Sequence, residues 1–246
     1  METFDTPLFE RTRWIFSSEQ LMRLIRARVL IAGVGGVGGF VAEALARAGV
    51  GKVVLIDHDR VTPSNLNRQL VALHSTLGQL KVEVMKQRML DIHPLIQVDA
   101  RAHFLAPDEM PGLMQEGFDV VVDAIDSLNC KVALLEAAWQ AKVPVFSSMG
   151  AGRRFDPTHI KVDDLMNTHG CGLARQLRQR LRKRGVGKGI RVVFSTESPC
   201  APGPLETIDQ ARGRVVNGTV SYMPGLFGLV LAGEVIKHLV ASAGGE

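Results

Sequence analysis

The sequence predicts an α/β protein with a doubly wound, mostly parallel sheet. Short apolar runs, typical of strands buried on both faces, alternate with segments of helical apolar spacing through the first 150 residues. The first of these strands leads through a glycine-rich turn directly into a helix. Because strand–helix–strand connections are right-handed, this alternation predicts a Rossmann-like arrangement. Later strand-like runs predict that a C-terminal extension continues the same sheet.

The elements can be placed in chain order. The first apolar run ends at Ala32, and the Ala-rich helix after its glycines stops where Gly49 and Gly51 interrupt the helical spacing. The other strands are runs rich in Val, Ile and Phe, and the other helices carry apolar residues at helical intervals. The expected strands are 29–32, 52–56, one within 97–104, 118–123, 143–147, 160–162 and 192–195, and the further expected helices are 19–28, about 81–92, 128–141 and 223–240.

Composition describes a globular protein with a mildly basic charge. The 246 residues are 46% hydrophobic, and the net charge of +4 hints at an anionic partner. Three cysteines form no Cys-x-x-Cys pair, which argues against a zinc site and favours a reducing, cytoplasmic setting. No apolar segment typical of a signal peptide opens the chain. The apolar run 223–240 contains three titratable residues, so we expect a buried core helix, with membrane-surface association as the alternative.

Gly33, Gly35 and Gly38 form the pattern Gly-x-Gly-x-x-Gly between the first strand and its helix. Gly33 permits a tight turn, Gly35 lets a phosphate approach the backbone, and Gly38 lets helix and strand pack closely. The helix N-terminus offers N–H groups to an anion. The pattern therefore predicts a nucleotide site, although tight turns also use glycine for packing alone.

Charged residues after later strands narrow the choice of nucleotide. Asp57 ends the second strand, where an acidic residue accepts ribose hydroxyls. Arg68 and Lys81 can neutralise a polyphosphate, and Asp126, beyond the fourth strand, can hold Mg²⁺. Each has a purely structural alternative: solvated charges for Arg68 and Lys81, a helix N-cap for Asp126, and a surface position for Asp59. Together, at one edge of one sheet, they favour ATP over a nicotinamide cofactor.

The combined motifs resemble those of a known family. Gly-x-Gly-Gly-x-Gly, Asp-x-Asp, Ser-Asn-Leu-Asn-Arg, Gly-x-x-Lys and Asp-x-Ile-Asp-Ser lie between about residues 10 and 150 and resemble the ThiF/MoeB/HesA family of ubiquitin-activating-like adenylating enzymes. The resemblance implies catalytic roles for Arg13, Arg68, Lys81 and Asp126, with Mg²⁺ at Asp126. Arg13 is similar to the arginine that this family inserts into a neighbouring subunit's site, which implies a homodimer. The ATP-binding residues that the resemblance implies are Gly33, Gly35, Gly36, Gly38, Asp57, Asp59, Asn65, Arg68, Lys81, Asp126 and Ser127.

A basic insertion distinguishes this chain within the family. No Asp or Glu occurs from Leu165 to Thr196, where arginines surround an apolar stripe of leucines at helical spacing. A basic run is usually a solvated face, but a like-charged helix without acidic partners repels itself unless an anion meets it. Phosphate contacts of this kind fit RNA. The predicted tRNA-binding residues are Arg175, Arg178, Arg182, Lys183 and Arg184.

Motifs in the second half resemble one branch. Gly150-Ala151-Gly152 and Phe194-Ser195-Thr196-Glu197, with the basic insertion, are similar to the tRNA threonylcarbamoyladenosine dehydratases, although Arg153-Arg154 stand where smaller residues are expected. The resemblance implies ATP-dependent adenylation of the threonyl carboxylate, followed by ring closure without a protein thiol. Catalysis by Cys171 is a minor alternative. The rival readings are an enzyme that adenylates the C-terminal glycine of a ubiquitin-like sulfur carrier, and a non-catalytic nucleotide- or RNA-binding module.

The same resemblance predicts how the chain is divided. Residues 1–246 are expected to form one ThiF-type adenylating domain, with an N-terminal helical arm (1–28), a nucleotide-binding core (29–150) and a C-terminal extension (151–246) that carries the basic insertion (165–196). The expected partners are tRNA and a second copy of the chain. Contact with a sulfur-relay or cysteine desulfurase system, and peripheral membrane association, are left open.

Overall fold

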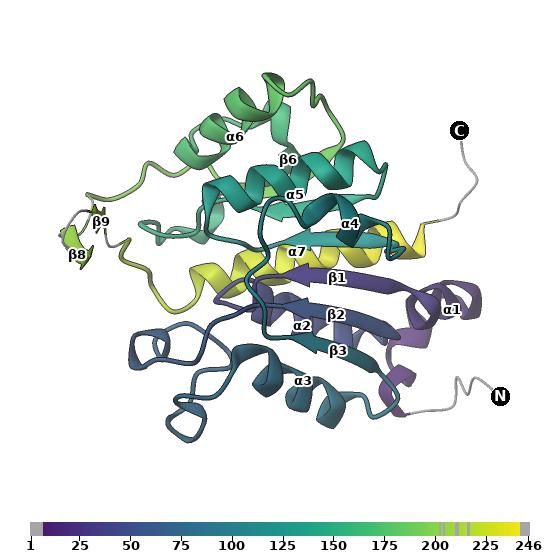
Figure 1. Cartoon of the computed structure of the whole chain (residues 1–246). Coiled ribbons are helices and arrows are strands. Elements are labelled where there is room, and N and C mark those ends of the chain that lie inside the picture. The colour runs from purple at the N-terminus through teal and green to yellow at the C-terminus, as the bar shows by residue number, and fades with distance from the viewer. Residues whose placement is uncertain (1–6, 202, 204, 210–211, 216, 242–246) are drawn as a thin grey trace.

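A seven-stranded sheet in the order β3-β2-β1-β4-β5-β7-β6 forms the middle layer of the computed structural model (Figure 1). The structure describes residues 7–201, 203, 205–209, 212–215 and 217–241. All neighbouring strands run parallel except β6, which pairs antiparallel with β7 at the edge. The strands are β1 (Arg28–Ala32), β2 (Lys52–Ile56), β3 (Gln97–Arg101), β4 (Val120–Asp123), β5 (Val145–Ser148), β6 (Ile160–Asp164) and β7 (Ile190–Ser195).

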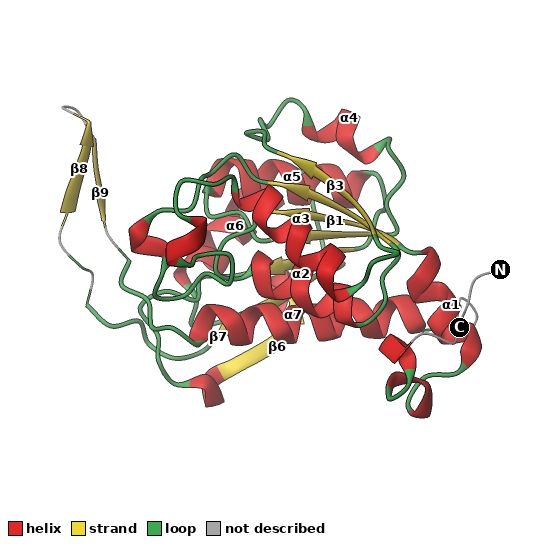
Figure 2. Ribbon diagram, turned by 90° about the horizontal axis from the view of Figure 1, so that it is seen from below, coloured by secondary structure: helices red, strands yellow, loops and turns green. Residues whose placement is uncertain are grey.

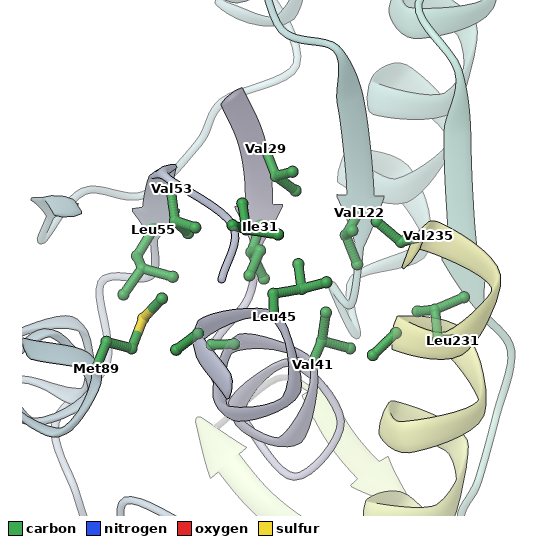
Figure 3. Close-up of a cluster of buried hydrophobic side chains, with 14 of the residues drawn as sticks. Val29, Ile31, Val41, Leu45, Val53, Leu55, Met89, Val122, Leu231 and Val235 are labelled. Atoms are coloured by element: carbon green, nitrogen blue, oxygen red, sulfur yellow. The ribbon is translucent and has the colours of Figure 1, made fainter. Parts of the chain in front are cut away.

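Helices cover both faces of the sheet. One face carries α1 (Ser18–Arg26), α2 (Gly38–Arg47), α3 (Lys81–Ile92) and α7 (Met223–Val240), and the other carries α4 (Met110–Met114), α5 (Leu128–Gln140) and α6 (Gly172–Arg182). Alternate residues of β1 serve the two faces: Val29 and Ile31 pack against α2 and α7 (Figure 3), whereas Leu30 packs on the α5 side. Burial on both faces explains why the central strands read as continuous apolar runs.

The order of the strands creates a switch point beside β1. The chain builds β1, β2 and β3 outward in one direction and then returns to place β4 on the other side of β1. In open parallel sheets, ligands bind outside the carboxyl ends of the strands at such a point. The fold therefore places a site where β1 and β4 end.

The predicted α/β fold with a mostly parallel, doubly wound sheet is confirmed, with differences at particular elements. The first helix ends at Arg26, two residues before the predicted end, because Ala27 is extended and Arg28 already pairs in β1. Its start is fixed by reciprocal hydrogen bonds between Ser17 and Gln20, a capping box. Two elements were not predicted. They are the short α4 and the hairpin formed by β8 (Leu205–Asp209) and β9 (Arg212–Val215), which stands away from the sheet (Figure 2).

The C-terminal helix α7 is a packed helix, as predicted. By length and composition it could cross a membrane, with a mean hydropathy of 1.4, but half of it is buried in the protein. It packs against α1, α2 and β5. Gly228 permits the close approach to α2, because a Cβ there would lie 2.5 Å from the carbonyl oxygen of Val37.

Candidate active site

A cavity of about 990 Å³ opens at the carboxyl ends of the parallel strands. Its walls begin where strands stop, at Gly33 after β1, Asp57 after β2, Ala124 after β4 and Met149 after β5. Ten of the eleven predicted ATP-binding residues line it. They are Gly33, Gly35, Gly36, Asp57, Asp59, Asn65, Arg68, Lys81, Asp126 and Ser127.

The eleventh residue, Gly38, lies behind the glycine turn and does not line the cavity. A Cβ at Gly38 would lie 1.8 Å from the carbonyl oxygen of Gly33, so Gly38 lets α2 pack onto the turn. Gly33 has a φ of +91°, and a Cβ there would lie 2.7 Å from the Ala124 carbonyl oxygen. Gly35 is different. Apart from its chain neighbours, the one described residue within 4 Å of a Cβ added there is Gln69, whose Nε2 would lie 3.8 Å away. Gly35 therefore presents open backbone to the cavity.

Asp57 connects β2 to the glycine turn. Its Oδ2 accepts a hydrogen bond from the Val34 N–H at 2.7 Å, and its Oδ1 accepts one from the Asp59 N–H at 2.8 Å. A carboxylate has about four acceptor positions, so both oxygens can still receive hydroxyl groups from the cavity.

Lys81 is a buried cation at the first position of α3. Its side chain is 5% exposed, and its Nζ lies 2.7 Å from Oδ2 of the half-exposed Asp59. Arg68 supplies a second cation. Its guanidinium donates to the Ser64 carbonyl and to Asn67 Oδ1, and no carboxylate of the described residues pairs with it. Arg68 therefore has no carboxylate among the described residues to compete with an anion in the cavity, whereas Lys81 shares its charge with Asp59.

The donor sets of the cavity can be compared with the needs of Mg²⁺. Within the described part of the chain, the side chains of Asp57, His58 and Asp59 form one cluster whose ligand atoms lie within 4.8 Å of one another. That cluster includes an imidazole nitrogen, and Asp59 already pairs with Lys81. Asp126 instead brings a carboxylate to the cavity wall at the end of β4. Because Mg²⁺ prefers oxygen ligands and bound phosphates, the carboxylate of Asp126 has the chemistry to hold it.

A buried charge network lies beneath the loop that carries Asp126. Asp123, Lys131 and Ser147 are each at most 1% exposed. Oδ2 of Asp123 accepts hydrogen bonds from Lys131 Nζ at 2.7 Å and from Ser147 Oγ at 2.6 Å, while its Oδ1 accepts from the Ile125 N–H. The network holds the start of the loop in place. Sequence reasoning missed it, although a lysine among the apolar positions of α5 was a signal.

The far half of the cavity comes from the C-terminal extension. Arg153 lines it with a φ of +62°, unusual for a residue other than glycine. Its N–H donates to the Gly218 carbonyl at 2.8 Å and its Nε donates to the Cys200 carbonyl at 2.6 Å. Buried Cys171 also lines the cavity, at the start of α6. Arg153 thus ties together the two segments that flank the β8–β9 hairpin.

An aromatic pair forms the wall after β2 and β3. The rings of His58 and Phe104 meet edge to face with centroids 5.1 Å apart, and both line the cavity. The loop that carries Phe104 is held by Glu109, which accepts hydrogen bonds from the Ala106 N–H and from His103. The backbone hydrogen bond, followed by the one from His103, keeps the pKa of Glu109 below its usual value.

Arg13 does not line the cavity of its own chain. It lies in a short 3-10 helix (Thr12–Trp14) on the surface, beside Trp14 and Ile15, which are 83% and 77% exposed. The structure therefore places Arg13 on an exposed apolar arm, outside the cavity formed by the other predicted catalytic residues.

The basic insertion forms helix α6, with Ala174, Leu177 and Leu181 buried. Its predicted RNA-binding residues fall into two groups. Arg178 donates to Thr168 Oγ1, and Arg184 pairs with Glu136 of α5, so this helix has an acidic partner that its own sequence lacks. Three others are exposed and make no ion pair with any residue that the structure describes. These are Arg175, Arg182 and Lys183.

Comparison with known proteins identifies relatives of this chain. A protein-family model described as "ThiF family" matches residues 9–245 of this chain. A tRNA threonylcarbamoyladenosine dehydratase of Bacillus subtilis is 38% identical over 241 residues, covering 94% of both chains. One of Escherichia coli is 36% identical, covering 96% of this chain and 94% of the relative.

Solved structures agree with the sequence relatives. A crystal structure of the Escherichia coli tRNA N6-threonylcarbamoyladenosine dehydratase in complex with ATP has a TM-score of 0.84 at 36% identity, covering 93% of this chain and 91% of that one. The same enzyme in complex with AMP gives a TM-score of 0.83 with similar coverage. The likeness therefore includes the core and the C-terminal extension.

Proposed function

The chain belongs to the ThiF family, and on that premise we propose that it catalyses the ATP-dependent dehydration of threonylcarbamoyladenosine in tRNA. The observation that carries the proposal is that one cavity is lined both by ten predicted nucleotide-binding residues and by segments of the C-terminal extension. Its volume of about 990 Å³ lies at the upper end of the range for small-molecule sites. In the proposed enzyme, the nucleotide and the modified nucleoside both bind in this cavity.

The reaction has two steps. An oxygen of the threonyl carboxylate attacks the α-phosphorus of ATP, and pyrophosphate leaves. The nitrogen of the substrate's ureido group next attacks the activated carbonyl carbon, loses its proton and expels AMP. The nucleoside thereby loses one water, and no protein thiol takes part. Because ring closure is intramolecular, positioning in the cavity supplies much of its rate.

The residues on the nucleotide side of the cavity have the following proposed roles. The Gly35 backbone faces the phosphates, Asp57 receives the ribose, and the charges of Arg68 and Lys81 offset the negative charge that builds up as pyrophosphate leaves. Asp126 holds Mg²⁺, which when bound neutralises phosphate charge. His58 and Phe104 offer a stacking surface to adenine. Asn65, Asp59 and Ser127 complete the nucleotide wall.

The proposal includes a homodimer, and the exposed arm that carries Arg13 supports it. Trp14 and Ile15 present apolar area that a second copy would cover. Arg13 lies beside them and would reach the partner's cavity. We place the enzyme in the cytoplasm, with its tRNA substrate. Contact with a sulfur-relay partner and association with a membrane are not part of the proposal.

Helix α6 is the proposed tRNA contact. We expect that replacing Arg175, Arg182 and Lys183 together by alanine raises KM for the tRNA about tenfold or more, because up to three phosphate contacts are lost. The slope of log affinity against log salt should fall by about 2–3 for the same reason. Filter binding of tRNA across a salt series, together with steady-state kinetics, measures both quantities.

Arg184→Ala is the matched control, because this arginine is already paired within the protein. It should change the salt slope by less than about 1. A triple variant with an unchanged salt slope would contradict this role for α6.

Mass analysis of nucleosides tests the proposed reaction. Threonylcarbamoylated tRNA incubated with the protein, ATP and Mg²⁺ should yield a nucleoside lighter by one water. An unchanged nucleoside would reject the proposal. Pyrophosphate exchange that depends on a ubiquitin-like protein would then favour a sulfur-carrier activator, and tRNA binding without turnover would favour a non-catalytic module.

A further inference from the structure

The carboxamide of Gln69 is buried in the cavity wall without a hydrogen-bond partner. Gln69 is 8% exposed and lines the cavity. Of its two polar atoms, Oε1 is the fully enclosed one and has no partner among the described residues, whereas Nε2, which also makes no hydrogen bond to them, is not enclosed. The backbone is well anchored, since the Gln69 N–H donates to the Asn65 carbonyl and the Gln69 carbonyl accepts from the Ala72 N–H. The backbone of Gln69 is therefore held in place, while its carboxamide has no hydrogen-bond partner among the described residues.

A buried amide without a partner is costly, so its persistence in a fixed position points to a partner that the chain itself does not supply. The surroundings indicate the chemistry of that partner. Nε2 lies 3.8 Å from the place a Cβ would take on Gly35, the glycine whose backbone is open to the cavity. The neighbouring residue is Arg68, whose guanidinium has no carboxylate partner among the described residues.

Gly35, the N-terminus of α2 and Arg68 all favour an anion at this end of the cavity. A carboxamide that meets an anion presents its N–H group, and rotation about the last side-chain bond exchanges the positions of nitrogen and oxygen. In either orientation, the carboxamide atom that is open to the cavity has no partner until a ligand arrives. A phosphate oxygen can accept the hydrogen bond that the carboxamide nitrogen of Gln69 offers.

We infer that Gln69 is a phosphate-binding residue, donating a carboxamide N–H to a phosphate oxygen of the bound nucleotide. The inference rests on the proposed function for the presence of ATP in this cavity. It adds a neutral donor to the cations Arg68 and Lys81.

Two substitutions of similar size test the inference, with ATP and Mg²⁺ as the probe in isothermal titration calorimetry. Gln69→Met removes both polar atoms and should weaken ATP binding about tenfold, since a hydrogen bond to a charged group is lost. Gln69→Glu replaces the donor with a negative charge that faces phosphate, and should weaken binding about 100-fold or more. Gln87→Glu, an exposed carboxamide on α3 outside the cavity, is the control for charge and should leave ATP affinity within twofold.

Thermal unfolding without nucleotide separates binding from a structural role. Because Gln69→Met removes an unsatisfied buried amide, its Tm should equal or exceed that of the parent while its ATP affinity falls. A lower Tm for Gln69→Met, or ATP affinity within twofold of the parent for both Gln69 variants, would overturn the inference. If the parent protein itself failed to bind ATP, the proposed function would fail first. The two failures are therefore distinguishable.

Discussion

Replacement of Lys81 by alanine is expected to lower kcat/KM for ATP by about 10²–10³-fold, a loss typical when one preorganised charge-stabilising group is removed. The Lys81 ammonium is buried at the cavity wall, and its partner Asp59 is half exposed. An exposed carboxylate left behind by the substitution can be solvated by water. The loss should therefore appear in turnover while the protein remains folded.

Steady-state kinetics of AMP formation on threonylcarbamoylated tRNA, together with circular dichroism, measures this effect. Lys86→Ala is the matched control, because Lys86 lies on the same helix α3 but outside the cavity. Its kcat/KM should stay within about twofold of the parent. Equal losses in the two variants would show that charge on α3 in general, and not the position of Lys81, affects the rate.

The second large effect is on stability. Lys131→Met should lower the free energy of unfolding by about 3–5 kcal/mol, because it leaves the Asp123 carboxylate buried without its cation. Asp123 is fully buried, and of its two side-chain partners only Ser147 would remain. For a chain of this length the loss corresponds to a fall in Tm of roughly 6–20 °C.

Differential scanning calorimetry checks this expectation. Adding Asp123→Asn to Lys131→Met removes the unpaired charge and should restore much of the lost Tm, whereas Lys188→Met at an exposed position should change it little. If the double variant were as unstable as the single one, the loss would come from packing around Lys131, and the charge explanation would be wrong.

The residues that line the nucleotide side of the cavity could be predicted from the sequence because of the topology of the sheet. Parallel strands end at one edge, so residues placed directly after strands, such as Asp57 and Asp126, converge without knowledge of side-chain packing. Asn65 and Arg68 could be predicted as well, because they lie at short, fixed spacings within one sequence motif. The predicted family is confirmed by the match over residues 9–245. The assigned roles of these residues, and the division of the chain into arm, core and extension, stay predictions.

The cavity residues of the C-terminal extension could not be predicted in the same way, because they reach the cavity through contacts between segments that are distant in the sequence. Arg153 lines it only because its backbone and side chain hold the loops at Cys200 and Gly218. Likewise, the sequence showed an acid-free basic helix, but not that Glu136 of α5 would pair with Arg184. Periodicity identifies which face of a helix is buried. It carries no information on which helix lies opposite.

The two hydrogen bonds of Asp57 also limit how this site can evolve. In many nucleotide-binding folds the acidic residue after the second strand is free to change, and cofactor preference changes with it. Here the same carboxylate accepts from the Val34 and Asp59 N–H groups through its two separate oxygens. An asparagine offers only one acceptor oxygen, so it would leave one of these N–H groups unpaired and loosen the glycine turn. Asp57 thus both lines the cavity and holds the glycine turn, so a substitution that changed what it offers to a ligand would also change the turn.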